Sequence, residues 1–192
     1  MSFSAPPPVA AWLHREARTG FEVAGLERVD GGLVATGCTT AVEDGQAWVV
    51  DYELRVWADW RTRSARVTRR VGAGSTTTTV ETDGHGRWQV DGVLRHDLRG
   101  CRDVDLESSA LTNALPVHRL GLEPGQSTEA PAAYVRASLA VERLEQTYTR
   151  VDVHERHQRF RYRAPFFGFQ CELVYDTSGF ALSYPGIAVR AL

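Results

Sequence analysis

The sequence predicts an all-β fold, and three observations support that class. Short runs alternate apolar and polar residues, as strands with one solvated face do. Turn signals of Gly, Pro, Asn and Asp return roughly every 8–12 residues, the spacing of a barrel, a roll or a sandwich. No stretch shows the three-turn amphipathic period of an ordinary helix, so we expect at most one or two short helices.

The composition is that of one ordinary globular domain. The chain has 192 residues, of which 43% are hydrophobic and 24% charged. A net charge of −2 gives no global attraction to nucleic acid, so no nucleic-acid partner is predicted. All 22 basic residues are arginines, which excludes Schiff-base and phosphate-loop lysine chemistry.

The first residues and the cysteines bear on location. Residues 1–8 are rich in proline and are predicted to be a disordered tail, followed by a single domain over residues 9–192. The start has neither the basic nor the apolar region of a signal peptide, and no run is long enough for a membrane span. Three widely spaced cysteines favour free thiols in a reducing compartment, so we expect a cytoplasmic protein.

The strands of the first half follow from the alternation. Residues 20–24 and 32–37 are predicted strands on either side of a turn at 30–32. The clearest strand spans residues 46–57, with Val50, Tyr52, Leu54 and Val56 on one face. Residues 65–71 form a strand with a basic face. Residues 76–81 and 87–90 flank a glycine-rich hairpin turn.

The second half repeats the pattern. Alternation predicts one strand over residues 134–141, and further strands at 146–151, 159–163, 169–175, 180–186 and 187–190. A weak similarity between two hairpins leaves open that the domain consists of two similar halves. The best helical segment is residues 108–114, which Ser108 or Ser109 would cap and Pro116 would end.

Polar groups are densest in the stretch 100–120, where the alternation breaks. Asp103 and Asp105 are two apart and would share a strand face, and His118 follows Pro116. Paired carboxylates can carry out acid–base chemistry or hold a cation. The alternative, which the spacing favours, is that they accept backbone hydrogen bonds or pair with arginines such as Arg119.

Other chemistries find little support. The six histidines are scattered without a metal-ligand spacing, no nucleophile elbow is present, and no glycine-rich phosphate loop occurs. We therefore predict no catalytic set, no metal site and no cofactor. Aromatic residues among arginines favour ordinary sheet faces with cross-strand pairs, although a roll could also hold an apolar ligand in its concave face.

Four motifs occur in order: residues 59–63 (DWRTR), 100–106 (GCRDVDL), 112–120 (TNALPVHRL) and 184–186 (YPG). Together they resemble the bacterial "putative glycolipid-binding" family, formerly a domain of unknown function, over most of the chain. The resemblance implies a single-domain spiral antiparallel β-roll, or partly open barrel. It also implies lipid or glycolipid binding, by analogy with periplasmic lipoprotein carriers. Two positions depart from the family pattern: Ser109-Ala110-Leu111 replaces Thr-Pro-Phe, and His118-Arg119 replaces a basic pair.

We therefore expect a non-catalytic protein that binds a lipid or glycolipid through an apolar concave face. The predicted polar contacts to the ligand are Trp60, Arg61, Asp103, Asp105, Asn113 and Arg119. Two alternatives stay open. One is a hydrolase acting on carbohydrate or lipid esters with Asp103, Asp105 and His118. The other is a structural homodimer without a small ligand.

Overall fold

The computed structural model describes residues 3–154 and 157–192, and it confirms the all-β class. Within these residues, one sheet has fourteen strands and a second has three, and the large sheet does not close into a barrel. One α-helix, α1 (Ala114–Leu120), is joined by three single-turn 3-10 helices: η1 (His96–Leu98), η2 (Leu111–Asn113) and η3 (Pro165–Phe167). The division into a tail of residues 1–8 and one domain over 9–192 stays a prediction.

The first half of the large sheet is an antiparallel meander. The strand predicted over 46–57 is confirmed with the same bounds, and its face of Val50, Tyr52, Leu54 and Val56 is buried. The hairpin around residues 83–86 is also confirmed. The strands of this meander are β1 (Val9–His14), β2 (Thr19–Val29), β3 (Gly32–Glu43), β4 (Gln46–Trp57), β5 (Thr62–Val71), β6 (Gly74–Thr82), β7 (Trp88–Val90) and β8 (Val93–Arg95).

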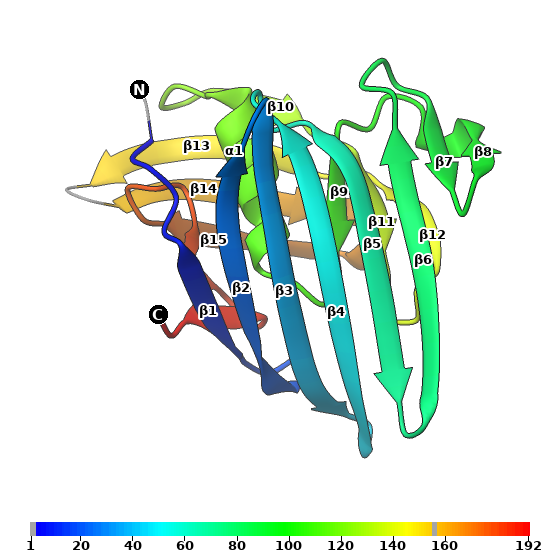
Figure 1. The fold of residues 1–192 in the computed structure, drawn as a ribbon. Helices are drawn as coiled ribbons and strands as arrows, with labels where there is room; N and C mark the ends of the chain where they lie inside the picture. Colours follow the sequence, from blue (N-terminus) through cyan, green and yellow to red (C-terminus); the bar gives the residue numbers. More distant parts are fainter. Residues whose placement is uncertain (1–2, 155–156) are drawn as a thin grey trace.

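The second half is another antiparallel meander, which runs behind the first in Figure 1. Its arginines alternate with buried residues, as on the strand that holds Phe160, Tyr162 and Ala164 on its inner face. The strands are β10 (Ser127–Glu129), β13 (Thr147–His154), β14 (His157–Ala164), β15 (Phe169–Tyr175), β16 (Ala181–Tyr184) and β17 (Ala188–Arg190).

The two meanders join where β1 pairs with β17. Trp12 lies opposite Arg190, and His14 lies opposite Ala188. The Trp12 indole N–H donates to the Ala181 carbonyl over 2.7 Å, and the Arg190 guanidinium carbon lies 5.0 Å from the centre of the Trp12 ring. This seam places the first and last described strands side by side in the middle of the sheet.

The small sheet contains a correction to the sequence prediction. The single strand expected over 134–141 is wrong: β11 (Ala132–Val135) and β12 (Val141–Leu144) form an antiparallel hairpin. Its turn is closed by the Arg136 and Leu139 backbone groups, and Leu139 has a φ of 72°. Alternation continues through the turn, so the pattern alone cannot show the reversal. The third strand, β9 (Asp103–Leu106), pairs with β11 in parallel.

The predicted helix is displaced along the chain. Residues 108–114 do not form an α-helix; η2 and then α1 begin near their end, and Pro116 lies inside α1. Pro116 is the third residue of the helix, where a backbone N–H would have no partner within the helix, so the ring is tolerated. Gly121 ends α1 in the left-handed conformation, with a φ of 55°.

The helix lies between the two layers of strands, as Figure 1 shows, and contributes to both hydrophobic cores. Ala114 and Leu115 pack in the core of the first meander, which includes Trp12 and Trp88. Val117 packs in the core of the second, which is rich in tyrosine. The stretch 100–120 is therefore the connection that holds the two layers together.

Candidate functional site

An aromatic cavity of about 290 Å³ opens between the small sheet and the second meander. Strands β9, β11 and β12 supply one side, and β14, η3, β15 and β16 supply the other. The volume lies near the lower end of the ~300–1,000 Å³ range of small-molecule sites. We call it the aromatic cavity, after the rings that line it: Tyr134, Tyr162, Phe167, Phe169 and Tyr184.

The rings support one another through edge contacts. The centroid of Tyr162 lies 5.9 Å from that of Tyr184 and 6.2 Å from that of Phe169. The centroid of Tyr134, on β11, lies 5.7 Å from that of Phe167, on η3, so this pair joins the two sides of the cavity. Such pairs add to the stability gained by burial. The Tyr162 hydroxyl donates to Gln146 Oε1 over 2.9 Å.

Asp105 is a buried acid in the wall of this cavity. Its Oδ1 accepts a hydrogen bond from the Thr112 hydroxyl over 3.0 Å. Burial raises the pKa of Asp105 to about 6, and the nearby Asp103 and Glu107 charges act in the same direction. A carboxyl group with this pKa can accept or donate hydrogen bonds to hydroxyl groups near neutral pH.

Asn113 also lines the cavity, where η2 leads into α1. The Tyr148 hydroxyl donates to its Oδ1 over 3.0 Å, and the Tyr175 hydroxyl donates to its carbonyl over 3.3 Å. These two hydroxyl groups come from strands of the second meander and contact only the oxygens of Asn113. The amide NH₂ group of Asn113 therefore remains as a donor. No hydrogen bond from that group is found within the described residues.

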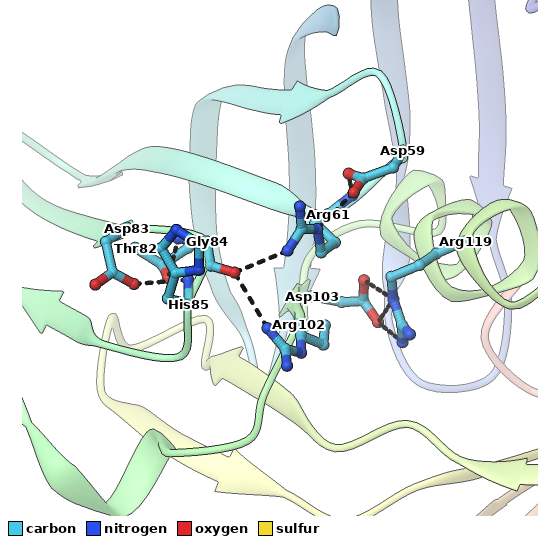
Figure 2. Close-up of polar contacts among 9 residues, drawn as sticks. All are labelled: Asp59, Arg61, Thr82, Asp83, Gly84, His85, Arg102, Asp103 and Arg119. Atoms are coloured by element: carbon cyan, nitrogen blue, oxygen red, sulfur yellow. Dashed lines mark hydrogen bonds and ion pairs between the residues drawn. The ribbon is translucent and has the colours of Figure 1, made fainter.

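Further polar side chains of the stretch take part in what we call the closed corner, defined by Glu22, Tyr52, Asp103, Ser109 and Arg119; of these five, Ser109 also lines the cavity. Arg119 grips the buried Asp103 with two nitrogens, Nε to Oδ1 at 2.9 Å and Nη2 to Oδ2 at 2.6 Å (Figure 2). Glu22, which is fully buried, accepts hydrogen bonds from the Tyr52 hydroxyl, the Ser109 hydroxyl and the Ala110 N–H. Burial raises the pKa of Glu22. These contacts tie the stretch to β2 and β4.

Two more predicted residues lie away from the cavity. Trp60 stacks on His118, with ring centroids 3.6 Å apart and an angle of 9° between the rings. Arg61 pairs with Asp59 and, together with Arg102, donates to the Gly84 carbonyl (Figure 2). Both arginines thus fix the hairpin turn at residues 83–86 to the body of the protein.

The structure therefore divides the six predicted contacts. Asp105 and Asn113 line the aromatic cavity, whereas the lining does not include Trp60, Arg61, Asp103 or Arg119. Their role in binding a ligand stays a prediction.

The catalytic alternative required Asp103, Asp105 and His118 to converge. Asp103 is held by Arg119, and Asp105 by Thr112. Burial lowers the pKa of His118 to about 4, so the ring is neutral at pH 7, and it lies against Trp60 instead of a carboxylate. Over the described residues, no hydrogen bond joins His118 to either acid, so the geometry gives the hydrolase no support.

Sequence reasoning missed several lining residues. Tyr134 and Tyr184 lie in segments read as ordinary strands, and Arg18 lies in the turn between β1 and β2. An aromatic residue on an inner strand face gives the same sequence pattern whether its ring fills a hydrophobic core or lines a cavity. No local signal distinguishes these residues, because the cavity arises where distant segments meet.

Two negative findings apply to residues 3–154 and 157–192. Over those ranges, no group of three His, Cys, Asp or Glu side chains is placed to hold a metal ion. No helix in those ranges is long and apolar enough to cross a membrane.

Comparisons with known proteins match nearly the whole chain. A family described as "Putative glycolipid-binding" matches residues 9–190. A crystal structure of a DUF1089 family protein from Pseudomonas aeruginosa is similar with a TM-score of 0.74 and 29% sequence identity, over 97% of this chain and 95% of that one. No curated protein matches the sequence.

Proposed function

This chain belongs to the "Putative glycolipid-binding" family, and from that premise we propose that it binds a lipid or glycolipid in the aromatic cavity without catalysis. The observation that carries the proposal is the cavity itself. It combines five aromatic rings with several polar groups, among them the carboxyl group of Asp105 and the amide of Asn113. Rings give contact area to an acyl chain or to the apolar face of a sugar, and the polar pair suits hydroxyl groups.

The volume limits what is enclosed. A cavity of about 290 Å³ is near the lower end of sites for drug-sized ligands, so it accommodates one sugar ring or part of one chain. The rest of the ligand would extend outward. A shallower groove that shares Glu43 and Glu107 with the cavity lies at this opening, and it also contains Trp48 and Arg136. Asp105 and Asn113 would contact the enclosed part.

The predicted residues outside the cavity have a supporting role in this proposal. Asp103, Arg119, Trp60 and Arg61 hold the stretch 100–120 and the hairpin turn, and through them the positions of Asp105 and Asn113. The three cysteines, Cys38, Cys101 and Cys171, are free, which suits a reducing compartment, and we infer a cytoplasmic location from this. A bacterial source stays a prediction. A homodimer stays a separate prediction.

Native mass spectrometry of the freshly purified protein tests the proposal, followed by titration with decyl β-glucoside. We expect a co-purified lipid, or saturable binding that Ala164→Leu abolishes because this residue lines the cavity. The control is Ala181→Leu, which adds the same volume to the same core at a buried position outside the lining. Absence of binding, or equal binding to both variants, would refute the cavity as the site.

A further inference from the structure

Arg18 is the cation in the wall of the aromatic cavity. It lies in the turn after β1, and only 9% of its surface is exposed. The turn is held in place by backbone bonds: Arg18 N–H to the Arg15 carbonyl at 3.0 Å, Arg15 N–H to the Ile187 carbonyl at 2.9 Å, and Ala17 N–H to the Gly186 carbonyl at 3.0 Å. The backbone of this turn is therefore held by the loop that follows Tyr184.

Within the described residues, the Arg18 side chain has no polar partner. Its guanidinium carbon lies 5.2 Å from the centre of the Trp48 ring, which is a cation–π contact. Its Nη1 is buried without a hydrogen bond, and no side-chain hydrogen bond or ion pair of Arg18 is found within the described residues. A guanidinium has five donor N–H groups, and buried polar groups are nearly always satisfied.

Over the described residues, none of the three acids that line the cavity, Glu43, Asp105 and Glu107, forms an ion pair with Arg18. Glu107 Oε2 accepts from the Ala137 N–H over 2.6 Å, and Asp105 Oδ1 accepts from Thr112. Glu43 lines the opening but forms no ion pair with Arg18 within the described residues. His14, which is close to Arg18, has a pKa lowered to about 4 by burial, and the Arg18 charge acts in the same direction. It is neutral at pH 7, so Arg18 supplies the positive charge.

Arg119 differs from Arg18 because it has a carboxylate partner. Arg119 has similar burial, with 16% of its side chain exposed, and it holds a carboxylate with two nitrogens. Planar guanidinium groups match carboxylate and phosphate oxygens in this two-point geometry. Arg18 lines the cavity and has the same kind of donor groups, but within the described residues no carboxylate pairs with it.

We propose that Arg18 binds an anionic group, a carboxylate or a phosphate, on an amphiphile whose apolar part lies among the cavity tyrosines. This inference rests on the proposed function and narrows its ligand from any lipid or glycolipid to an anionic one. The anion occupies the Arg18 side of the cavity, and the chain extends toward Tyr162 and Tyr184. Glu43 and Glu107 at the opening disfavour a ligand with a second negative charge there.

Titration calorimetry with four amphiphiles that share a ten-carbon chain tests the inference: decanoate, decyl phosphate, decan-1-ol and decyl β-glucoside. We expect at least one anion to bind roughly 10–100-fold more tightly than decan-1-ol, the range that hydrogen bonds to a charged group provide. The stronger of the two anions identifies the group as carboxylate or phosphate.

The variant Arg18→Gln should bind the anions no more tightly than the neutral ligands. Its affinity for the anions should fall, and its affinity for the neutral ligands should stay unchanged. The control Arg15→Gln removes the same charge three residues away, at an exposed side chain outside the cavity lining, and should keep the preference. Equal binding of anions and neutral ligands to the natural protein would overturn the inference while leaving the proposed function intact. An unchanged preference in Arg18→Gln would also overturn it, and binding of none of the four would refute both. If Arg18→Gln does not fold, the ratio in the natural protein decides.

Discussion

The closed corner and the aromatic cavity use the same kinds of side chain in opposite ways. In the corner, Arg119 and Asp103 satisfy each other, and Glu22 accepts three hydrogen bonds. In the cavity, Arg18 has no polar partner among the residues that the structure describes, and Asp105 has one hydroxyl donor. Buried polar groups that are fully paired fix a structure, whereas those with unused capacity are available to a ligand. The number of hydrogen-bond partners therefore distinguishes the closed corner from the aromatic cavity more clearly than residue type does.

The largest effect is expected from breaking the paired side of this comparison. Asp103→Ala leaves the Arg119 guanidinium largely buried without its carboxylate, which should reduce the free energy of unfolding by ~3–5 kcal/mol. Urea denaturation at pH 7 measures the change. A loss below ~1 kcal/mol would mean that the pair is not structural, and that Arg119 is as available as Arg18.

The next effect concerns the acid in the cavity and depends on pH. The pKa of Asp105 is raised from 3.8 to about 6 in the folded protein, so its contribution is fully present below pH 4 and is lost as pH rises through 6. The stability of the natural protein relative to Asp105→Asn should therefore fall by up to ~3 kcal/mol between pH 4 and 7. Urea midpoints across this range measure the difference.

That comparison needs the variant because two histidines act in the opposite direction. The pKa values of His14 and His118 are both lowered to about 4, so their contribution is present above pH 6.5 and is lost as pH falls. The natural protein and Asp105→Asn share these histidines, so their effect cancels in the stability difference between the two proteins. A difference that is constant with pH would show that Asp105 titrates normally.

A smaller effect tests how tightly the corner is packed. A Cβ at Gly37 would lie 2.2 Å from Tyr52 Cζ, so Gly37→Ala should cost ~1–3 kcal/mol by overpacking. Gly25→Ala, on the neighbouring strand β2, is the matched control because its Cβ would meet no atom closer than 3.6 Å. Thermal unfolding of the two variants should separate them, and similar melting temperatures would contradict tight packing around Tyr52.

The smallest effect comes from an exposed ion pair. Asp59 is 52% exposed and pairs with Arg61, so Asp59→Ala should cost only ~0–1 kcal/mol. Urea denaturation beside Asp103→Ala measures both pairs under one condition. If the two losses are equal, burial does not determine the strength of these arginine–aspartate pairs.

Much of the fold could be predicted from the sequence because alternation is a local property. Strand β4 has the predicted bounds, since its period of two continues without interruption between two turns. The hairpin of β11 and β12 was missed because Leu139, a residue rarely found at positive φ, makes the turn. The helix was displaced because Pro116 was read as an end, although it is equally compatible with a first turn.

The candidate site could be predicted only in part. The crowding of polar residues around 100–120 led to Asp105 and Asn113, which do line the cavity. The same signal also selected Asp103 and Arg119, because pairing is decided by tertiary contacts that spacing does not reveal. Arg18 gave no signal, since a single arginine in a turn looks like any surface residue until its surroundings are known.

The seam between β1 and β17 has a consequence for synthesis. Strand β1 is synthesised long before β17, so its second hydrogen-bonding edge finds its partner only when residues 188–190 have been made. At ~5–20 residues per second, that edge stays open for on the order of ten to thirty seconds. An unpaired edge attracts other chains. The nascent protein is therefore most exposed to aggregation while it is being translated, and the last strand ends that interval.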